Sequence, residues 1–183
     1  MKQLGFVFNG ARCSGCAACV IACKEEKQLP DGVWLRRRVE NPSTMSFLTL
    51  GCNHCDDPAC LKVCPVKAYH KEANGLVIQD HHKCIGCQAC VGACPYHVPS
   101  FAKSEKKVYK CDACQARLAK GEVPACVASC PMGAIEFGAI DELRAKYPEA
   151  VEQGMVWAAK EFHFPSPQLT HPNLVIVPLS SGE

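Results

Sequence analysis

The sequence lacks three features that identify large classes of proteins: an excess of one charge, a long hydrophobic run and a glycine-rich phosphate loop. Its 183 residues carry 20 Lys and Arg against 18 Asp and Glu, a balance that argues against nucleic acid as a partner. No run reaches the roughly 20 apolar residues of a membrane-spanning helix, so we expect any membrane contact to involve another subunit. No glycine-rich loop follows a predicted strand, which excludes the dinucleotide-binding and P-loop motifs.

The N-terminal stretch MKQLGFVFNGARCSGC also lacks the apolar segment of a secretory signal and a twin-arginine motif. We therefore expect a cytoplasmic protein by default. The alternative is a membrane-associated protein, or one exported already folded with a signal-bearing partner. In the reducing cytosol, thiols in large number bind metal more often than they form disulfides.

Cysteine is abundant: it provides 16 of the 183 residues, about 9%, a level typical of a disulfide scaffold or a metal framework. The cysteines form four groups of four, and none is left over. Group one is Cys13, Cys16, Cys19 and Cys23; group two is Cys52, Cys55, Cys60 and Cys64; group three is Cys84, Cys87, Cys90 and Cys94; group four is Cys111, Cys114, Cys126 and Cys130.

Groups one and three have the spacing CxxCxxCxxxC, which is the bacterial ferredoxin run. In that run three thiolates hold one 4Fe-4S cluster, and the fourth cysteine, on the helix that follows, ligates a neighbouring cluster. Proline follows the last cysteine of groups two, three and four, as in the motif, whereas Lys24 follows group one. The spacing therefore predicts iron-sulfur clusters in exchanging pairs.

A structural zinc site is the alternative, because it also takes four cysteines. Zinc sites typically consist of two CxxC pairs joined by a longer spacer, and the tight third ligand of groups one and three fits this poorly. Group four alone, with CxxC and then CxxxC across eleven residues, resembles a zinc motif. The fourth cysteine of each ferredoxin run needs a reciprocal cluster, and this favours iron-sulfur chemistry for all four groups.

The stretches between the groups predict short strands, one helix and one hairpin. The hairpin, over residues 68–80, turns through Asn74-Gly75 and joins groups two and three, so we pair these groups with each other. Groups one and four then pair across the insertion. Strands are expected over residues 4–8, 33–39, 46–50, 107–110 and 134–137, and a helix over residues 20–28.

The expected fold is α+β, with two interleaved bacterial-ferredoxin-like units that each bind two 4Fe-4S clusters. Residues 1–45 and 105–140 form the outer unit, and residues 46–104 form the inserted unit. Residues 141–183 are expected to form one short C-terminal helix and an extended, proline-rich tail. The predicted ligands are Cys13, Cys16, Cys19 and Cys130 for cluster 1; Cys111, Cys114, Cys126 and Cys23 for cluster 2; Cys52, Cys55, Cys60 and Cys94 for cluster 3; and Cys84, Cys87, Cys90 and Cys64 for cluster 4.

Three side chains are candidates for tuning the clusters through charge or hydrogen bonds. His54 lies between two ligands of group two, and Lys83 and Lys110 directly precede the first ligands of groups three and four. The run Arg36-Arg37-Arg38 is interpreted as a solvated face, with docking to an acidic partner as the alternative. A cubane held by four thiolates has no open coordination site, so we expect no catalytic residues.

The segments CNHCDDPAC, HKCIGCQACVGACPY, KCDAC and PACVASCP closely resemble the four-cluster electron-transfer subunit of the dimethyl sulfoxide reductase family. The resemblance covers roughly residues 4–138 and includes the absence of a proline after group one. It implies a non-catalytic iron-sulfur subunit of an oxidoreductase complex in anaerobic respiration. Because Cys87 is present, it implies four 4Fe-4S clusters, where some relatives hold a three-iron cluster.

The resemblance also implies partners. Single electrons would pass between a catalytic subunit with a molybdenum or tungsten pterin and a second redox partner, either a membrane quinone-binding subunit or a soluble carrier. The group-one cluster would face the catalytic subunit, and the group-three cluster would lie toward the membrane. The alternative is a stand-alone or filament-forming polyferredoxin that serves a hydrogenase, formate-oxidising or aldehyde-oxidising system, and the cysteine count does not separate the two.

Overall fold

A three-stranded sheet organises one end of the molecule in the computed structural model, which describes residues 2–179. Its central strand β1 (Leu4–Asn9) pairs antiparallel with β8 (Ile135–Ala139) and parallel with β9 (Leu174–Val177). Side chains alternate between the two faces of a strand, so Phe6 and Phe8 enter one hydrophobic cluster and Val7 enters another. Both faces of β1 are therefore buried.

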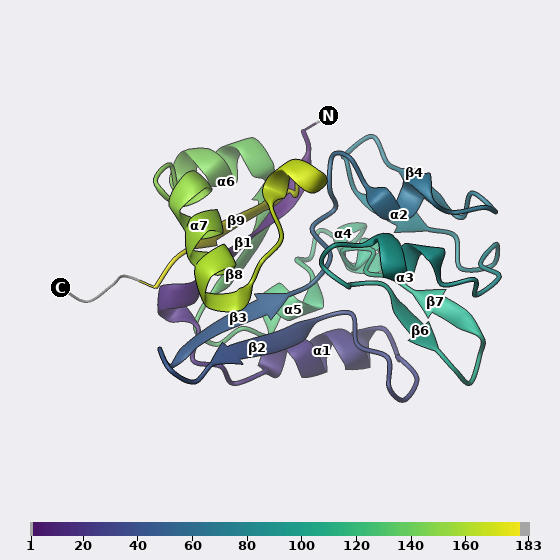
Figure 1. Cartoon of the computed structure of the whole chain (residues 1–183), viewed down its shortest axis with the longest axis horizontal. Coiled ribbons are helices and arrows are strands. Elements are labelled where there is room, and N and C mark those ends of the chain that lie inside the picture. The colour runs from purple at the N-terminus through teal and green to yellow at the C-terminus, as the bar shows by residue number, and fades with distance from the viewer. Residues whose placement is uncertain (1, 180–183) are drawn as a thin grey trace.

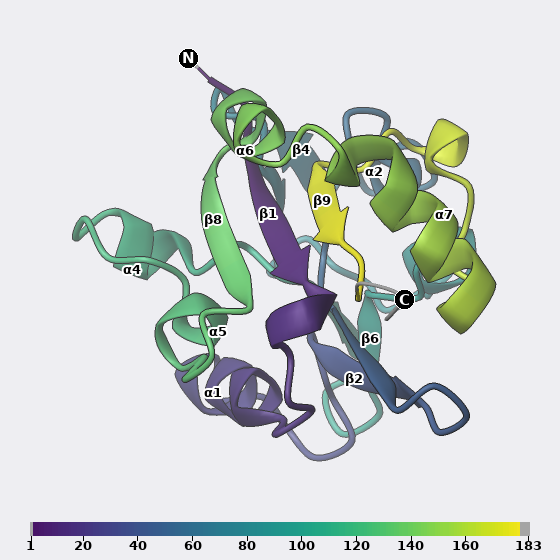
Figure 2. The ribbon, with the colours of Figure 1, turned by 90° about the vertical axis from the view of Figure 1, so that its left-hand side faces the viewer.

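Two helices, α6 (Ile140–Lys146) and α7 (Ala150–Phe162), follow β8 and pack on this sheet (Figure 2). Helix α7 approaches β9 closely at Gly154, where an added Cβ would lie 1.6 Å from the carbonyl oxygen of Ile176. The sequence predicted one short helix in this region. Pro148 separates the two helices, because proline cannot continue α6 but is tolerated before the start of the next helix.

The remaining strands form three antiparallel hairpins. The expected turn at Asn74-Gly75 is present, and Gly75 has the positive φ of 78° that such a turn requires. The hairpins are β2 (Arg37–Asn41) with β3 (Ser46–Leu50), β4 (Tyr69–Lys71) with β5 (Val77–Gln79), and β6 (Ser100–Ala102) with β7 (Lys107–Tyr109).

Short helices carry or follow the cysteines. Helix α1 packs on α5, and α2 packs on α3. The bounds are α1 (Ala18–Glu26), α2 (Ala59–Lys62), α3 (Ala89–Ala93), α4 (Gln115–Leu118) and α5 (Ala125–Ala128), with 3-10 turns η1 (Gly10–Arg12) and η2 (Pro167–Leu169).

Two features that follow group one are the strand expected over residues 33–39 and the lysine in place of proline. The strand expected over residues 33–39 is wrong in its first half, because β2 begins at Arg37. Val33 and Leu35 lie in a loop and are buried beside Cys23. Lys24, which replaces the usual proline, allows α1 to continue to Glu26, and its Nζ donates hydrogen bonds to the carbonyls of Leu29 and Pro30 at 3.1 and 3.0 Å.

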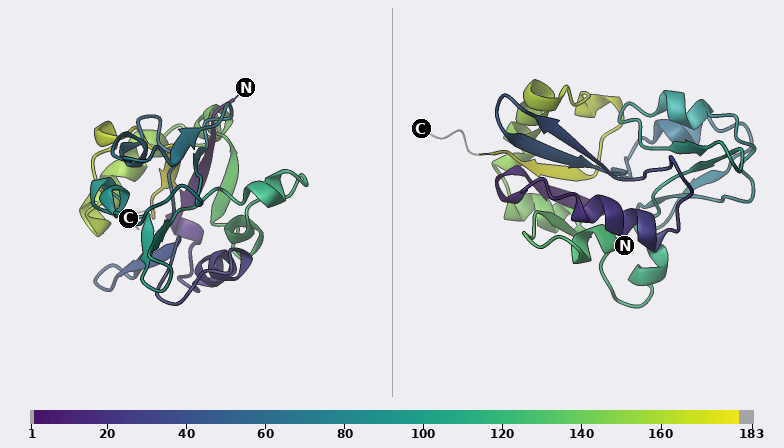
Figure 3. Two further views of the ribbon diagram at one scale, coloured as in Figure 1. Left: turned by 90° about the vertical axis from the view of Figure 1, so that its right-hand side faces the viewer. Right: turned by 90° about the horizontal axis from the view of Figure 1, so that it is seen from below.

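The elements lie along the longest axis of the molecule. The three-stranded sheet with α6 and α7 lies to the left in Figure 1, and α2, α3 and the hairpins β4–β5 and β6–β7 lie to the right. The view from below in Figure 3 shows the same separation of the C-terminal helices from the α2 and α3 pair. Within residues 2–179, no helix combines the length and apolar character needed to cross a membrane.

Candidate metal centres

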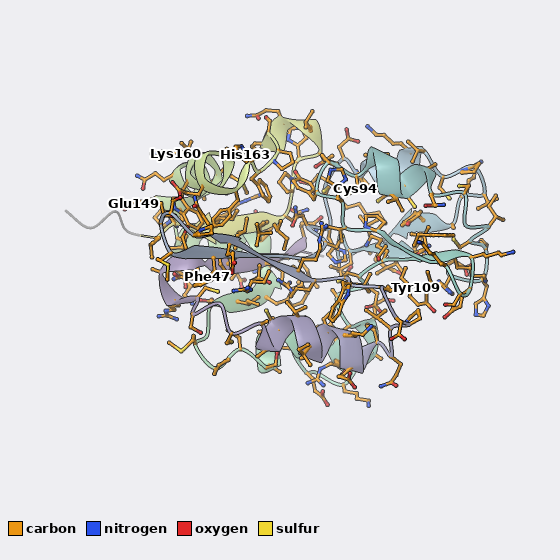
Figure 4. All side chains as sticks on the ribbon, turned by 60° about the horizontal axis from the view of Figure 1, so that its bottom comes forward. Phe47, Cys94, Tyr109, Glu149, Lys160 and His163 are labelled. Atoms are coloured by element: carbon orange, nitrogen blue, oxygen red, sulfur yellow. The ribbon has the colours of Figure 1, made fainter. Side chains whose placement is uncertain are left out.

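Cysteines from different groups meet around three cavities. Each cavity has three cysteines from one group and the last cysteine of another, which is the exchange expected of a ferredoxin run. Figure 4 shows Cys94, from group three, beside the helices on the right and Phe47, which lies over the group-one loop, toward the left. The cavities are lined by Cys13, Cys16, Cys19 and Cys130; by Cys52, Cys55, Cys60 and Cys94; and by Cys84, Cys87, Cys90 and Cys64.

The fourth set is Cys23, Cys111, Cys114 and Cys126. Cys23 and Cys126 lie on α1 and α5, which pack against each other, and Cys23 and Cys111 share one hydrophobic cluster. Burial raises the pKa of Cys23 to about 12, and the nearby sulfur atoms of Cys126 and Cys114 contribute to the rise. The structure therefore brings together all four predicted sets.

The loops of groups one and three have the same backbone shape. Gly15 and Gly86 both have a φ of 72°, and two residues later Ala17 and Gln88 have φ values of 63° and 62°. A left-handed conformation is unfavourable for a residue with a Cβ atom and is tolerated where function requires it. The two runs, which share one cysteine spacing, therefore share one loop geometry.

Backbone amides donate hydrogen bonds to cysteine sulfur atoms. A donor directed at sulfur stabilises the thiolate form and tunes a cluster bound to it. The donor and acceptor pairs are His54 N to Cys52 Sγ at 3.4 Å, Ala68 N to Cys64 Sγ at 3.3 Å, Val108 N to Cys84 Sγ at 3.4 Å, Ala113 N to Cys111 Sγ at 3.4 Å and Ala134 N to Cys130 Sγ at 3.2 Å.

Burial makes these thiols poor acids by themselves. It raises the pKa values of Cys55 and Cys60 to about 12. A buried thiolate needs a neighbouring positive charge, and an iron-sulfur core supplies one. Two buried hydrogen-bond donors also line cysteine cavities: Asn53 Nδ2, which has no protein partner among the described residues, lines the cavity of Cys52, and the Tyr69 hydroxyl lines the cavity of Cys90.

A single zinc ion and a 4Fe-4S cluster place different demands on four cysteines. Zinc holds tetrahedral thiolates at about 2.3 Å, which brings their sulfur atoms to roughly 3.8 Å from one another. Within residues 2–179, no group of three or more His, Cys, Asp or Glu side chains converges in the manner required by one ion. The four cysteines around each of the three cavities instead line one shared space, an arrangement that fits a cluster of four irons with one thiolate on each.

His54 is fully buried and has one defined tautomer. The Val77 amide donates to its Nδ1 at 3.1 Å, so in the neutral ring the proton resides on Nε2, which lies 3.9 Å from Cys111 Sγ. Burial holds the pKa of His54 well below its usual value, and the charge of Lys110 adds to this effect. His54 is therefore a neutral hydrogen-bond donor directed at a cysteine sulfur.

The two candidate lysines have different environments. Lys110 is only 9% exposed, and its Nζ donates to the carbonyls of Val77 and, at 2.7 Å, of Cys111. Burial alone lowers the pKa of Lys110, but the nearby cysteine sulfurs raise it by more, so the ammonium form is favoured. The side chain of Lys83 is 62% exposed and pairs with Asp80 at 3.5 Å, so the structure does not bring it to a sulfur atom in the described part of the chain.

Arg36 corrects the interpretation of the arginine run as a solvated face. It is 6% exposed, lies 5.7 Å from the centre of the Phe6 ring and donates to Thr49 Oγ1 at 3.3 Å. That hydroxyl lies 3.4 Å from Cys19 Sγ. Burial lowers the pKa of Arg36, but the sulfurs of Cys126 and Cys19 raise it by more. Nothing in three consecutive arginines signals which one turns inward.

The C-terminal tail supports the group-two loop, a role that the sequence did not reveal. Asn173 donates from Nδ2 to the His54 carbonyl at 2.8 Å and to Asp56 Oδ1 at 3.0 Å. The Thr170 carbonyl accepts from the Asp57 amide at 3.1 Å, and its hydroxyl lies 3.0 Å from the Tyr96 hydroxyl. The tail therefore holds the loop that carries Cys52 and Cys55.

Two models of iron-sulfur protein families match the segments that contain the cysteine groups. A model described as a 4Fe-4S dicluster domain matches residues 43–140, and a model described as a 4Fe-4S binding domain matches residues 11–26. Together the matched ranges include all four cysteine groups.

Curated relatives extend the similarity over nearly the whole sequence. The B subunit of the anaerobic dimethyl sulfoxide reductase of Escherichia coli strain K12 is 40% identical over 96% of this protein and 89% of its own length. The B subunit of the polysulfide reductase of Wolinella succinogenes is 36% identical over 99% and 97%. The thiosulfate reductase electron transfer subunit PhsB of Salmonella typhi is 39% identical over 77% and 78%.

Proposed function

We propose that single electrons pass along a line of four clusters in this protein, which belongs to the family of iron-sulfur electron-transfer subunits that includes the B subunit of anaerobic dimethyl sulfoxide reductase. Its four 4Fe-4S clusters supply the capacity to accept and release single electrons. The polypeptide itself holds them, shields the inner two from water and sets the distances between all four. The observation that carries the proposal is the meeting of cysteines from two groups around each of three cavities, with the fourth set packed between α1 and α5.

The proposed ligand sets are the four predicted from the spacing, and we call them sites 1 to 4 after the clusters 1 to 4 that they would hold. Their contacts support a linear order of sites 1, 2, 3 and 4. Cys19 of site 1 packs against the hydrophobic cluster that contains Cys126 of site 2. His54 donates from its amide to Cys52 Sγ of site 3 and places its ring Nε2 3.9 Å from Cys111 Sγ of site 2. Cys60 and Cys90 share one hydrophobic cluster, which relates site 3 to site 4.

The interleaved division of the sequence is part of the proposal. The packing of α1 on α5 supports an outer unit of residues 1–45 and 105–140, and the packing of α2 on α3 supports an inserted unit of residues 46–104. Residues 141–183 form a third segment, whose described part covers the sheet and the group-two loop.

The two ends of the proposed relay are the exposed ones. Cys16 of site 1 and Cys87 of site 4 are exposed, whereas no cysteine of sites 2 and 3, all of which lie within residues 2–179, is exposed. Apolar side chains are exposed beside both ends, at Met132 near site 1 and at Ile85 near site 4. We assign the site-1 end to a catalytic partner with a molybdenum or tungsten pterin, and the site-4 end to a membrane quinone-binding subunit or a soluble carrier.

The test is a metal analysis of the protein purified anaerobically from its native host together with its bound partners. We expect about sixteen irons per polypeptide, since each 4Fe-4S cluster contains four, and co-eluting molybdenum or tungsten. Sixteen irons with neither metal would support the stand-alone polyferredoxin instead. Zinc in place of iron would overturn the electron-transfer function. Fractionation of the same cells distinguishes a cytoplasmic complex from a membrane-associated or exported one.

A further inference from the structure

The junction between sites 2 and 3 differs from the other two steps of the proposed relay. Within each ferredoxin-like unit, an exchanged cysteine connects the helix of one site to the cluster of the next, as for Cys23 and Cys64. Sites 2 and 3 belong to different units and exchange no cysteine. His54 connects the two sites, because its amide donates to Cys52 Sγ of site 3 and its ring lies 3.9 Å from Cys111 Sγ of site 2. The side chains around these two cysteines therefore determine how the sites influence each other.

Lys110 occupies this junction. Its ammonium group donates to the carbonyl oxygens of Val77 and of Cys111, a residue of site 2, and its side chain lines the cavity of site 3 with Cys52 and Cys60. Among the ion pairs of residues 2–179, none joins a carboxylate to Lys110. Its charge is therefore directed at the two cysteine sites and not at an acidic side chain.

His54 adds a hydrogen bond at the same place. Its Nδ1 accepts from the Val77 amide, so its Nε2 proton is directed at Cys111 Sγ, 3.9 Å away. The ring comes from the group-two loop of the inserted unit and reaches a cysteine of the outer unit. His54 and Lys110 both contact Val77, so the two units meet around this one residue of β5.

We propose that Lys110 and His54 form a fixed positive and hydrogen-bonding bridge that raises the reduction potentials of clusters 2 and 3 relative to a junction without them. Reduction adds negative charge to a cluster, and burial opposes this addition, whereas a nearby cation and a donor to sulfur favour it. The bridge keeps the two buried inner sites reducible in the step that crosses from one unit to the other. This inference rests on the proposed ligand sets, and Lys110 and His54 act in it as positioning and tuning residues.

The test is a redox titration of the four clusters by electron paramagnetic resonance, in the anaerobically purified complex with its bound partners. The variant is Lys110→Met, and the matched control is Lys83→Met, because each lysine directly precedes the first cysteine of a group but only Lys110 is buried. We expect Lys110→Met to shift the one-electron reduction equilibrium of two clusters at least tenfold toward the oxidised form, which corresponds to about 59 mV. Lys83→Met should leave all four clusters unchanged.

Lys110→Arg keeps the charge and should retain potentials closer to those of the wild type than Lys110→Met does. If Lys110→Met loses iron, the pair His54→Leu and His54→Gln provides the test: leucine should lower the potential of one cluster, and glutamine, which keeps an N–H donor, should restore it in part. Equal titration of wild type, Lys110→Met and His54→Leu would overturn the bridge. Absence of iron from the wild type would instead overturn the proposed function, so the two failures are distinguishable.

Discussion

Two lysines stand directly before the first cysteine of a group, and they have opposite environments. Lys83 follows β5 at a turn, is mostly exposed and pairs with Asp80. Lys110 follows β7 and extends inward, where two carbonyls hold its ammonium group among cysteines of two sites. Position directly before a cysteine group is therefore not enough to bring the charge of a lysine into the interior. The site that borders another unit receives the buried cation, whereas the site at the outer end has a solvated one.

The two loops with the ferredoxin spacing, those of groups one and three, also differ in what supports them. The loop of group three rests its Gly86 against the main chain of Lys106, whereas the matching Gly15 of group one rests against the ring of Phe47. Backbone cannot move aside as readily as a side chain. Equivalent positions in the two ferredoxin runs are therefore expected to differ in their tolerance of substitution.

Charge reversal should have the largest effect and should separate the two lysines most clearly. Lys110→Glu places a carboxylate in a buried site beside cysteine sulfurs, and an uncompensated buried charge costs about 3–5 kcal/mol of unfolding free energy. We expect loss of iron from sites 2 and 3, measured by iron content and thermal unfolding. Lys83→Glu is the control and should change stability by less than about 0.5 kcal/mol. A similar loss of iron in both variants would contradict the assigned difference between the sites.

Substitution of the two loop glycines should have the next largest effect. A Cβ at Gly86 would lie 2.0 Å from the Lys106 carbonyl oxygen, and one at Gly15 would lie 2.7 Å from the Phe47 ring. Both positions have a positive φ, which costs an alanine roughly 1–2 kcal/mol, and overpacking adds about 1–3 kcal/mol. We expect Gly86→Ala to destabilise the protein more than Gly15→Ala in denaturant unfolding. The reverse order would show that Phe47 is the less movable neighbour.

The smallest expected effect concerns the tail. Thr170→Val removes the hydroxyl that pairs with the Tyr96 hydroxyl at 3.0 Å and should cost about 1–3 kcal/mol, because a buried polar group loses its partner. The change should weaken site 3 more than site 1, in spectra of the four clusters recorded after partial iron loss. Gln168→Ala, on the exposed turn just before Thr170, is the control. Equal weakening of sites 1 and 3 would show that the tail does not support the group-two loop.

Several features of the fold were predictable because they depend on short segments. The hairpin at Asn74-Gly75, strand β3 over 46–50 and the helix after group one follow from local turn chemistry and residue type. The ferredoxin-type domains and the 4Fe-4S cofactors are confirmed by the family models. The individual ligand sets and the interleaved units stay proposals, supported by the cysteine cavities and by helix packing. Strand β9 was not predicted, because its pairing with β1 joins residues far apart in the sequence.

The sequence by itself determined the kind of chemistry, because the spacing of cysteines within a dozen residues limits which metal centre a loop can hold. It also indicated which groups pair, since a hairpin brings groups two and three together. Only the tertiary structure decided which of three arginines is buried, which of the two lysines before a cysteine group is buried and what the tail covers. The physical reason is that these properties depend on burial, and burial arises from contacts between segments that are distant in the sequence.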